Sequence, residues 1–387
     1  MSYRKVNDNS LSSVADAIRS KGGTSDALVF PDGFVTAISA IQTGGGEAAP
    51  SAKWSDVTFI DYDGTVLYSY TLAQAQALTE LPALPEHDGL VCQGWNWTLE
   101  AIKALNRPVT VGAMYITDDG ATRLHIRIAT VGRMTVPLYI GQTVENGVSI
   151  DWGDGSTAET LAGTGDVNTS HTYAEPGDYV ISLMPKDSCT LSLGKKSSPY
   201  CVMGTTGNNG IVYCNMLQDV FVGESVTSID VGAFYYCYSL ASITIPDGVT
   251  SIGASAFYYC YSLSSVTIPD SVTSISSNAF RSCYSLASVT IPDSVTSVGG
   301  NAFYSCYSLS SVTIPDSVTS ISSNAFYSCY GMRYYDFSAC TDIPTLSNAS
   351  AFDNIPPDCQ MLIPTALYDE WSTATNWATY ASYMAAV

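Results

Sequence analysis

The sequence predicts a mainly β, multidomain chain that ends in a solenoid of short repeats. A 23-residue unit recurs between Cys214 and Cys340, as in CYSLSSVTIPDSVTSISSNAF and CYSLASVTIPDSVTSVGGNAF. Before the repeats, short segments of alternating apolar residues are separated by Gly, Asp and Pro, which is typical of β-strands and their turns. A fixed period of this length indicates coils that stack on one another.

Each repeat predicts one coil with three sides. In Leu263–Pro269, the apolar Val266 and Ile268 are two residues apart, as in a strand with one face buried. Pro269 has no N–H and ends the strand. After a turn and a second apolar stretch, residues 279–283 supply a third side, which we expect to be 3₁₀ or short helical. Coils about 4.8 Å apart would place Phe on Phe and Cys on Cys.

The repeat resembles a known family. The pattern A-F-x-x-C-x-x-L-x-x-[IV]-x-I-P-x-x-V-x-x-I is similar to the BspA-like leucine-rich repeats of bacterial surface antigens and phage structural proteins. The resemblance covers 206–345, with a degenerate first repeat at 214–232. It implies an adhesive or binding surface.

Cysteines form a ladder within the repeats. Six of the eleven share the 23-residue step, at Cys214, Cys237, Cys260, Cys283, Cys306 and Cys329. Because free Cys is among the most buried residue types, we expect buried free thiols. No histidine accompanies the ladder and its spacing matches no zinc motif, so no metal or cofactor is predicted. Cys340 and Cys359 are the better candidates for a disulfide.

Residues 1–46 predict a small helical docking module that ends in a glycine linker. Ser10 can cap a helix, Gly22 and Gly23 end it, and a second short helix follows. VADAIRSKGGTSDALVFPDGFVTAI resembles a segment of structural proteins of phages of Gram-positive bacteria. The resemblance implies a virion context; a generic helical hairpin is the alternative.

Residues 53–106 predict a hairpin around Asp63–Gly64, a helix near Leu72–Leu78 and a helical tail over Leu99–Leu105. The hairpin, paired prolines and a Gly-Trp pair resemble the β-grasp Listeria–Bacteroides repeat. Asp61, Asp63 and Gly64 resemble part of a calcium loop, but the closing Glu is missing, so a plain turn is favoured.

Residues 107–190 predict an immunoglobulin-like sandwich. IDWGDGS at Ile150–Ser156 and HTYAEPGDYVISL at His171–Leu183 resemble the two hallmark segments of PKD domains, which are spacers and adhesion modules. The resemblance implies a buried Trp152 and a tight turn at Asp154–Gly155. A structural turn beside a histidine at the rim of the core is favoured over a catalytic or metal site.

The remaining segments flank the repeats. Residues 191–213 are rich in Gly, Ser and Asn and predict a loop. Residues 346–387 predict a C-terminal cap, with a strand that ends at Pro364 and a helix from about Thr365. Phe352 follows Phe326 at a longer spacing than the repeat. An open solenoid end would leave apolar groups in water, so a cap is expected.

Composition narrows the function. The net charge is −20, which disfavours nucleic acid and anionic membranes as partners, and no apolar run is long enough to span a bilayer. The N-terminus lacks the apolar core of a signal peptide. Three scattered histidines and the absence of a nucleophile or nucleotide motif predict no catalytic residues, so we expect no enzyme.

Two rows of outward residues are candidates for binding. One row is polar and lies on the strands, with Ser before each threonine: Thr244, Thr267, Thr290 and Thr313. The other is aromatic: Tyr235, Tyr238, Tyr258, Tyr261, Tyr284, Tyr304, Tyr307, Tyr327 and Tyr330. Tyrosine is enriched in binding surfaces. The alternative is that these rings only pack on each other. Arg281 interrupts the aromatic row.

These patterns lead to a hypothesis of a non-enzymatic phage virion protein of the tail or baseplate. Residues 1–46 would attach it to other virion proteins, and the solenoid would bind a protein or glycan on the host cell. It would then be found on the virion and become extracellular on lysis. A bacterial cell-surface adhesin is the alternative, and a carbohydrate-active enzyme is a third. A homotrimer fits a virion fibre, although the chain has no heptads.

Overall fold

The computed structural model divides the chain into two units, Met1–Trp54 and Ser55–Val387. It describes residues 57–60, 66–87, 90–95, 99–103, 109–117, 119–186, 188–194, 200–205 and 214–387. The predicted helical module at 1–46 and the turn at 61–64 lie outside these ranges.

The first sheet has the strand order β2-β1-β4-β3. Its strands are β1 (Val57–Ile60), β2 (Val66–Tyr70), β3 (Leu90–Trp95) and β4 (Val109–Thr117). β1 and β2 pair antiparallel, which confirms the predicted hairpin. Helices α3 (Leu72–Gln76) and α4 (Leu99–Lys103) confirm the two predicted helical segments, and Thr71 caps α3 in a capping box. β4 lies beyond the boundary expected at residue 106 and completes this sheet.

A two-sheet sandwich follows. One sheet contains β5 (Thr122–Ile128), β10 (Gly177–Pro185), β7 (Val148–Asp151) and β8 (Glu159–Thr160), and the other pairs β6 (Thr135–Gln142) with β9 (Gly165–Thr172). A 3₁₀ turn, η1 (Val131–Arg133), connects β5 to β6. The inward residues of both sheets form one core. Two sheets thus pack face to face, while the immunoglobulin-like and PKD assignments of 107–190 stay predictions.

The turn after β7 has the structure expected from its sequence. Trp152 is buried, and Gly153 and Gly155 have φ values of 76° and 81°, which glycine adopts without strain. The Asp154 carboxylate accepts a bond from the Ser156 N–H at 3.0 Å, and its Oδ2 lies 2.7 Å from His171 Nε2. The His171 ring stacks on Trp152. The turn therefore has a structural role, as predicted.

The sandwich and the solenoid share both of their sheets. β14 (Leu217–Phe221) pairs antiparallel with β5 of the sandwich and parallel with β16 (Ser242–Thr244) of the next coil. β11 (Leu191–Leu193) pairs with β6 on one side and β15 (Val226–Ile229) on the other. The loop expected over 191–213 thus contains a joining strand, and a hairpin of β12 (Tyr200–Cys201) and β13 (Gly204–Thr205).

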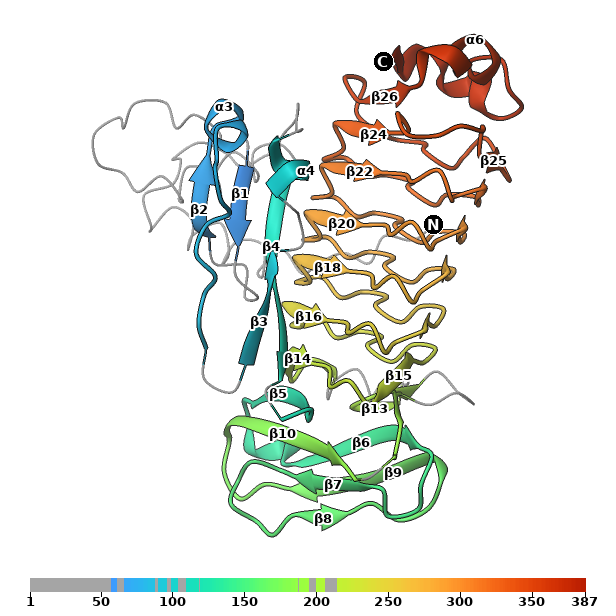
Figure 1. Ribbon diagram of the computed structural model, residues 1–387. Coiled ribbons are helices and arrows are strands. Elements are labelled where there is room, and N and C mark those ends of the chain that lie inside the picture. Colours follow the sequence, from blue (N-terminus) through green and yellow to red (C-terminus); the bar gives the residue numbers. More distant parts are fainter. Residues whose placement is uncertain are drawn as a thin grey trace, which may run out of the picture. The chain divides into compact units, whose positions relative to one another are not determined.

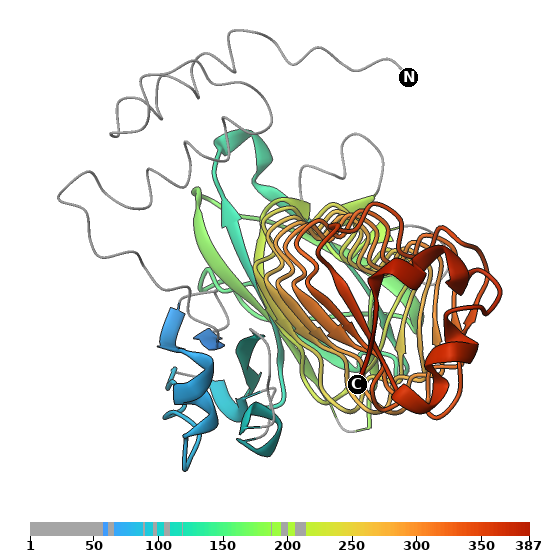
Figure 2. The same ribbon diagram turned by 90° about the horizontal axis from the view of Figure 1, so that it is seen from above.

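Parallel strands build two sides of each coil (Figure 1). The first row continues through β18 (Ser265–Thr267), β20 (Ser288–Thr290), β22 (Ser311–Thr313), β24 (Tyr334–Asp336) and β26 (Gln360–Ile363). The second continues through β17 (Ser251–Ile252), β19 (Ser274–Ile275), β21 (Ser297–Val298), β23 (Ser320–Ile321) and β25 (Thr345–Leu346). Seen along the stack, successive coils overlie one another (Figure 2). The solenoid prediction is confirmed.

The third side of the coil differs from the expected 3₁₀ or helical segment. It consists of turns, because two residues of each coil have positive φ. One position is filled by Gly232, Ser255, Asn278, Asn301 and Asn324; the other is filled by Tyr236, Tyr259, Ser282, Ser305 and Ser328. A left-handed residue cannot continue a right-handed helix. The left-handed residues instead donate their N–H groups to the next coil: Asn278 donates to the Gly300 carbonyl at 2.9 Å and Ser282 to the Tyr304 carbonyl at 2.7 Å.

The core contains two ladders. The rings of Phe234, Phe257, Phe280, Phe303 and Phe326 stack with centroids 5.2 to 5.4 Å apart. The six cysteines that share the 23-residue step are buried free thiols, as predicted. Each of four donates its S–H to the phenylalanine carbonyl of the preceding coil at 3.2 to 3.3 Å: Cys260, Cys283, Cys306 and Cys329. The expected disulfide is wrong, since Cys340 and Cys359 are free and contact the carbonyls of Ile314 and Gln360.

The predicted cap closes the far end of the core. After β26 come η2 (Thr365–Leu367), α6 (Tyr368–Trp371), η3 (Trp377–Tyr383) and β27 (Met384–Ala386), which adds a parallel strand to β26. Phe352 stacks on Phe326 at 5.4 Å, despite its longer spacing. Trp377 packs against Phe352, and its indole N–H donates to the Pro344 carbonyl at 2.7 Å. The last apolar ring is therefore covered.

The left-handed positions lead to a stability prediction. Asn301→Val should lower the free energy of unfolding by about 1–2 kcal/mol, because a β-branched residue resists positive φ. Asn301→Gly should change it little, since relief of φ offsets the lost bond between the Asn301 and Asn324 side chains. Thr290→Val, on a strand, is the control. Chemical denaturation measures all three; equal losses for Asn301→Val and Thr290→Val would contradict the prediction.

The Asp154 turn leads to a pH prediction. Hydrogen bonds from Ser156 and His171 lower the pKa of Asp154 to about 2. A carboxyl whose pKa is lowered on folding stabilises the folded state above its unfolded pKa, and this is lost as the pH falls through the folded pKa. Asp154→Asn should therefore be less stable than the wild type at pH 5 and above. Denaturation at a series of pH values should show the difference shrinking between about pH 4 and 2; a constant difference would refute this.

Candidate binding surface of the repeats

Five tyrosines that follow the buried cysteines form a continuous ladder, here called ladder A: Tyr238, Tyr261, Tyr284, Tyr307 and Tyr330. Successive ring centroids lie 4.5 to 5.2 Å apart, and the planes differ by 4° to 22°. Tyr307 is 40% exposed and Tyr330 is 57% exposed. The rings therefore pack on each other, and they also leave an aromatic edge open to solvent.

The residues that follow the buried phenylalanines form a second ladder, here called ladder B: Tyr235, Tyr258, Arg281, Tyr304 and Tyr327. Arg281 does not interrupt it. The Arg281 Cζ lies 5.2 Å from the Tyr258 ring centroid and 4.5 Å from that of Tyr304, so the guanidinium takes the place of a ring. Tyr304 and Tyr327 then stack at 4.9 Å.

Two further tyrosines that were not among the predicted binding residues lie beside the ladders. Tyr236 and Tyr259 stack on each other at 5.0 Å beside the first coils of both ladders. They occupy left-handed positions, with φ of 64° and 65°, where later coils have serine. A bulky residue is rare there. The sequence shows them as the second tyrosine of the motif FYYCY at 234–238 and 257–261, a position that the aromatic row predicted above does not include.

Six phenols of the two ladders have a raised pKa and therefore remain protonated at neutral pH: Tyr235, Tyr238, Tyr258, Tyr261, Tyr284 and Tyr304. Burial is the largest cause of the raised pKa, and in Tyr235, Tyr258 and Tyr261 the neighbouring tyrosines add to the shift. A protonated phenol can donate as well as accept a hydrogen bond. The ladders thus combine apolar ring faces with hydrogen-bonding hydroxyls, which is the surface chemistry expected of a binding site for sugars or peptides.

The threonine row lies in the strands, on a different side of the coil from the turns that carry the tyrosines. Thr267 pairs in register with Thr290, and Thr313 is exposed while Thr244, Thr267 and Thr290 are half-buried. The serines of this row are less open than expected. Ser242, Ser288 and Ser311 are buried, because a short side chain lies between its neighbours in adjacent coils. The row therefore offers less accessible polar surface than the sequence suggested.

Two histidines, His125 and His171, each face a carboxylate. His125 Nδ1 lies 3.4 Å from Asp219 Oδ2, and the Ser242 hydroxyl donates to the same carboxylate at 3.2 Å. The serine therefore faces the acid and not the histidine, which would have to act as its base. His171 is held by Asp154 in the structural turn described above.

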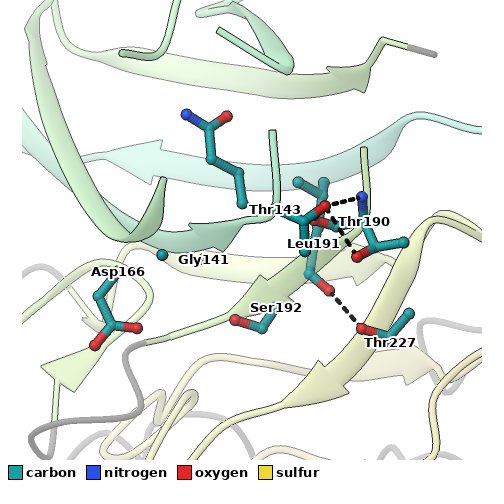
Figure 3. A pocket seen from close by; sticks show the side chains of 9 residues that line it. Gly141, Thr143, Asp166, Thr190, Leu191, Ser192 and Thr227 are labelled. Atoms are coloured by element: carbon teal, nitrogen blue, oxygen red, sulfur yellow. Dashed lines mark hydrogen bonds between the residues drawn. The ribbon is translucent and has the colours of Figure 1, made fainter. Parts of the chain in front are cut away.

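A small pocket lies where the sandwich meets the first coils (Figure 3). Residues of β6, β9, β11 and β15 line it, among them Asp166 and Thr227, together with Thr143 just after β6 and Thr190 just before β11. The Thr190 N–H donates to Thr143 Oγ1 at 2.9 Å, and the Thr227 hydroxyl donates to the Leu191 carbonyl at 3.4 Å. Asp166 is its one acidic side chain, so a carboxylate pair for glycoside cleavage is not formed there.

In the part of the chain that the structure describes, no helix is both long and apolar enough to cross a bilayer.

Comparison with known proteins identifies the repeats. Residues 205–333 match six copies of a BspA type leucine rich repeat region. No curated protein matches the chain.

Several solved structures are similar. A leucine-rich repeat protein from Bacteroides ovatus is 32% identical, with a TM-score of 0.30, over 36% of this chain and 37% of that one. A leucine rich repeat protein of T. pallidum is 25% identical, with a TM-score of 0.29, over 40% of this chain and 86% of that one. A leucine rich cell surface protein from Faecalibacterium prausnitzii is 21% identical, with a TM-score of 0.23, over 48% and 78%.

This chain therefore spans 37% of the length of the first of these structures. The repeats and their register agree with the family match. Residues 205–333 are a BspA-type leucine-rich repeat region.

Proposed function

We propose that this protein is a non-enzymatic recognition protein whose solenoid binds a protein or glycan on a cell surface. The observation that carries the proposal is ladder A, an unbroken stack of five tyrosines whose last two rings are well exposed. Large exposed aromatic surface is uncommon on a protein that binds nothing. Ladder B adds phenol groups and one cation on the same side of the coils.

Recognition by ladder A has a physical basis. Rings fixed by their neighbours lose little conformational entropy on binding, and their faces and hydroxyls can contact a sugar or peptide together. The threonine row is the second candidate surface, but buried serines flank it. The tyrosines are therefore the stronger candidates for contact residues.

The carrier of the recognition surface is proposed to be a phage virion, with residues 1–46 as the attachment module. The support is the resemblance of VADAIRSKGGTSDALVFPDGFVTAI to phage structural proteins. A bacterial cell-surface adhesin is the second candidate, because BspA-type repeats also occur in surface antigens. Antibody detection separates the two: the protein should be found in purified particles released by lysis, and not on intact, unlysed producer cells.

Binding to cells tests the role of ladder A. Fluorescently labelled full-length protein should stain particular strains in a panel of Gram-positive bacteria. The double variant Tyr307→Ala with Tyr330→Ala should bind about tenfold more weakly, which corresponds to the loss of about 1.4 kcal/mol.

Two matched variants serve as controls. Tyr307→Phe with Tyr330→Phe keeps the rings and should retain most of the binding. Asp293→Asn changes an exposed turn residue away from the ladders and should bind as the wild type does. Undiminished binding by the double alanine variant would exclude ladder A as the contact surface.

A further inference from the structure

Three thiols meet where the first coil joins the sandwich. The Sγ atoms of Cys201, Cys214 and Cys237 all lie within 4.8 Å of one another, and all three residues are buried. Cys214 and Cys237 belong to the 23-residue register, whereas Cys201 does not. The absence of a metal site was predicted from the ladder alone, and that spacing did not reveal the third thiol.

Backbone hydrogen bonds fix Cys201 in place. It lies at the end of β12, and its neighbour Val202 is bonded on both sides. The Tyr139 N–H of β6 donates to the Val202 carbonyl at 2.8 Å, and the Val202 N–H donates to the Ala233 carbonyl of the first coil at 2.7 Å. The thiol is thus held between the sandwich and the solenoid by bonds to both, as a preorganised site requires.

The cluster differs from the rest of the ladder in its partners. Cys260, Cys283, Cys306 and Cys329 each donate to a backbone carbonyl. Cys237 instead has the Cys201 sulfur 3.5 Å from its own. Metal ions bind the thiolate form of cysteine.

Ligand chemistry narrows the choice of ion. Thiolate sulfurs select soft or borderline ions such as Cu⁺ and Zn²⁺ over Mg²⁺ and Ca²⁺. Binding would release three protons to solvent and form three metal–sulfur bonds, with no change of oxidation state. Three thiolates leave a net charge of −1 around Zn²⁺, which also prefers a fourth ligand such as water. Around Cu⁺ the net charge is −2.

We infer that Cys201, Cys214 and Cys237 form a binding site for one thiophilic d¹⁰ metal ion, Zn²⁺ or Cu⁺, that fastens the first coil to the sandwich.

The test uses reduced, full-length protein kept free of oxygen. Zn²⁺ and Cu⁺ are added in separate arms against a competing chelator, and the bound metal per chain is counted by elemental analysis. We expect one ion per chain in at least one arm. Cys201→Ser and Cys237→Ser should each weaken binding more than about a hundredfold, because even the loss of an outer-shell partner costs roughly 10- to 100-fold.

Cys283→Ser is the matched control, since this cysteine is equally buried and lies in the same ladder, away from the cluster. It should bind the metal as the wild type does. Thermal unfolding guards against loss of fold: the metal should raise the unfolding temperature of the wild type and of Cys283→Ser, but not of Cys201→Ser.

Three results would overturn the inference. One is that the protein binds neither ion in competition with the chelator. Another is that Cys283→Ser loses as much metal as Cys201→Ser does. The third is a disulfide between Cys201 and Cys237. Mass spectrometry would find it in protein isolated without reductant, and it would form again after reduction and prevent metal binding.

Discussion

The registration of each coil on the next is the constraint on which the rest of the structure depends. A coil of 23 residues cannot bury its own apolar side chains, so each phenylalanine is covered by the phenylalanines above and below it. The same registration brings each cysteine S–H to a carbonyl of the preceding coil. It also aligns the N–H groups of the turns with carbonyls of the next coil. The last coil shows how far this register tolerates a change of length: Phe352 follows Phe326 after 26 residues instead of 23 and still stacks on it.

The two ends of the solenoid are covered by different elements, because each end would otherwise expose a sheet edge and an apolar surface. At the start, the sandwich supplies β5 and β11, so both rows of strands begin on an existing sheet. At the finish, β27 extends the first row while Trp371 and Trp377 cover the last phenylalanine rings. The sandwich is therefore more than a spacer, since it forms the first layer on which the repeats are built.

The sequence was sufficient for the features that repeat and insufficient for those that occur once. Period, strand positions, buried Phe and Cys, and the cap follow from side-chain pattern, which local residues determine. Shared sheets do not: Leu191–Leu193 is too short to be recognised as a strand without its two partners. The cluster at Cys201 likewise depends on a hairpin fold that brings a residue outside the register to the ladder.

The prediction for the third side of the coil was wrong because asparagine and serine in left-handed positions resemble ordinary turn residues in a sequence. The sequence predicted the rows of tyrosines. It did not predict that Arg281 takes the place of a ring in ladder B, which follows only from its distances to Tyr258 and Tyr304.

The similarity of the inner coils also bears on how such a chain can change in the course of evolution. Each of them presents one surface to its predecessor and a matching one to its successor, and the specialised partners are needed only at the two extremities. A tandem duplication or deletion of one 23-codon unit therefore inserts or removes a whole layer and leaves both extremities intact. Unequal recombination between near-identical gene segments can add or remove one tyrosine of each ladder at a time. The length of the proposed binding surface can therefore change while the fold stays the same.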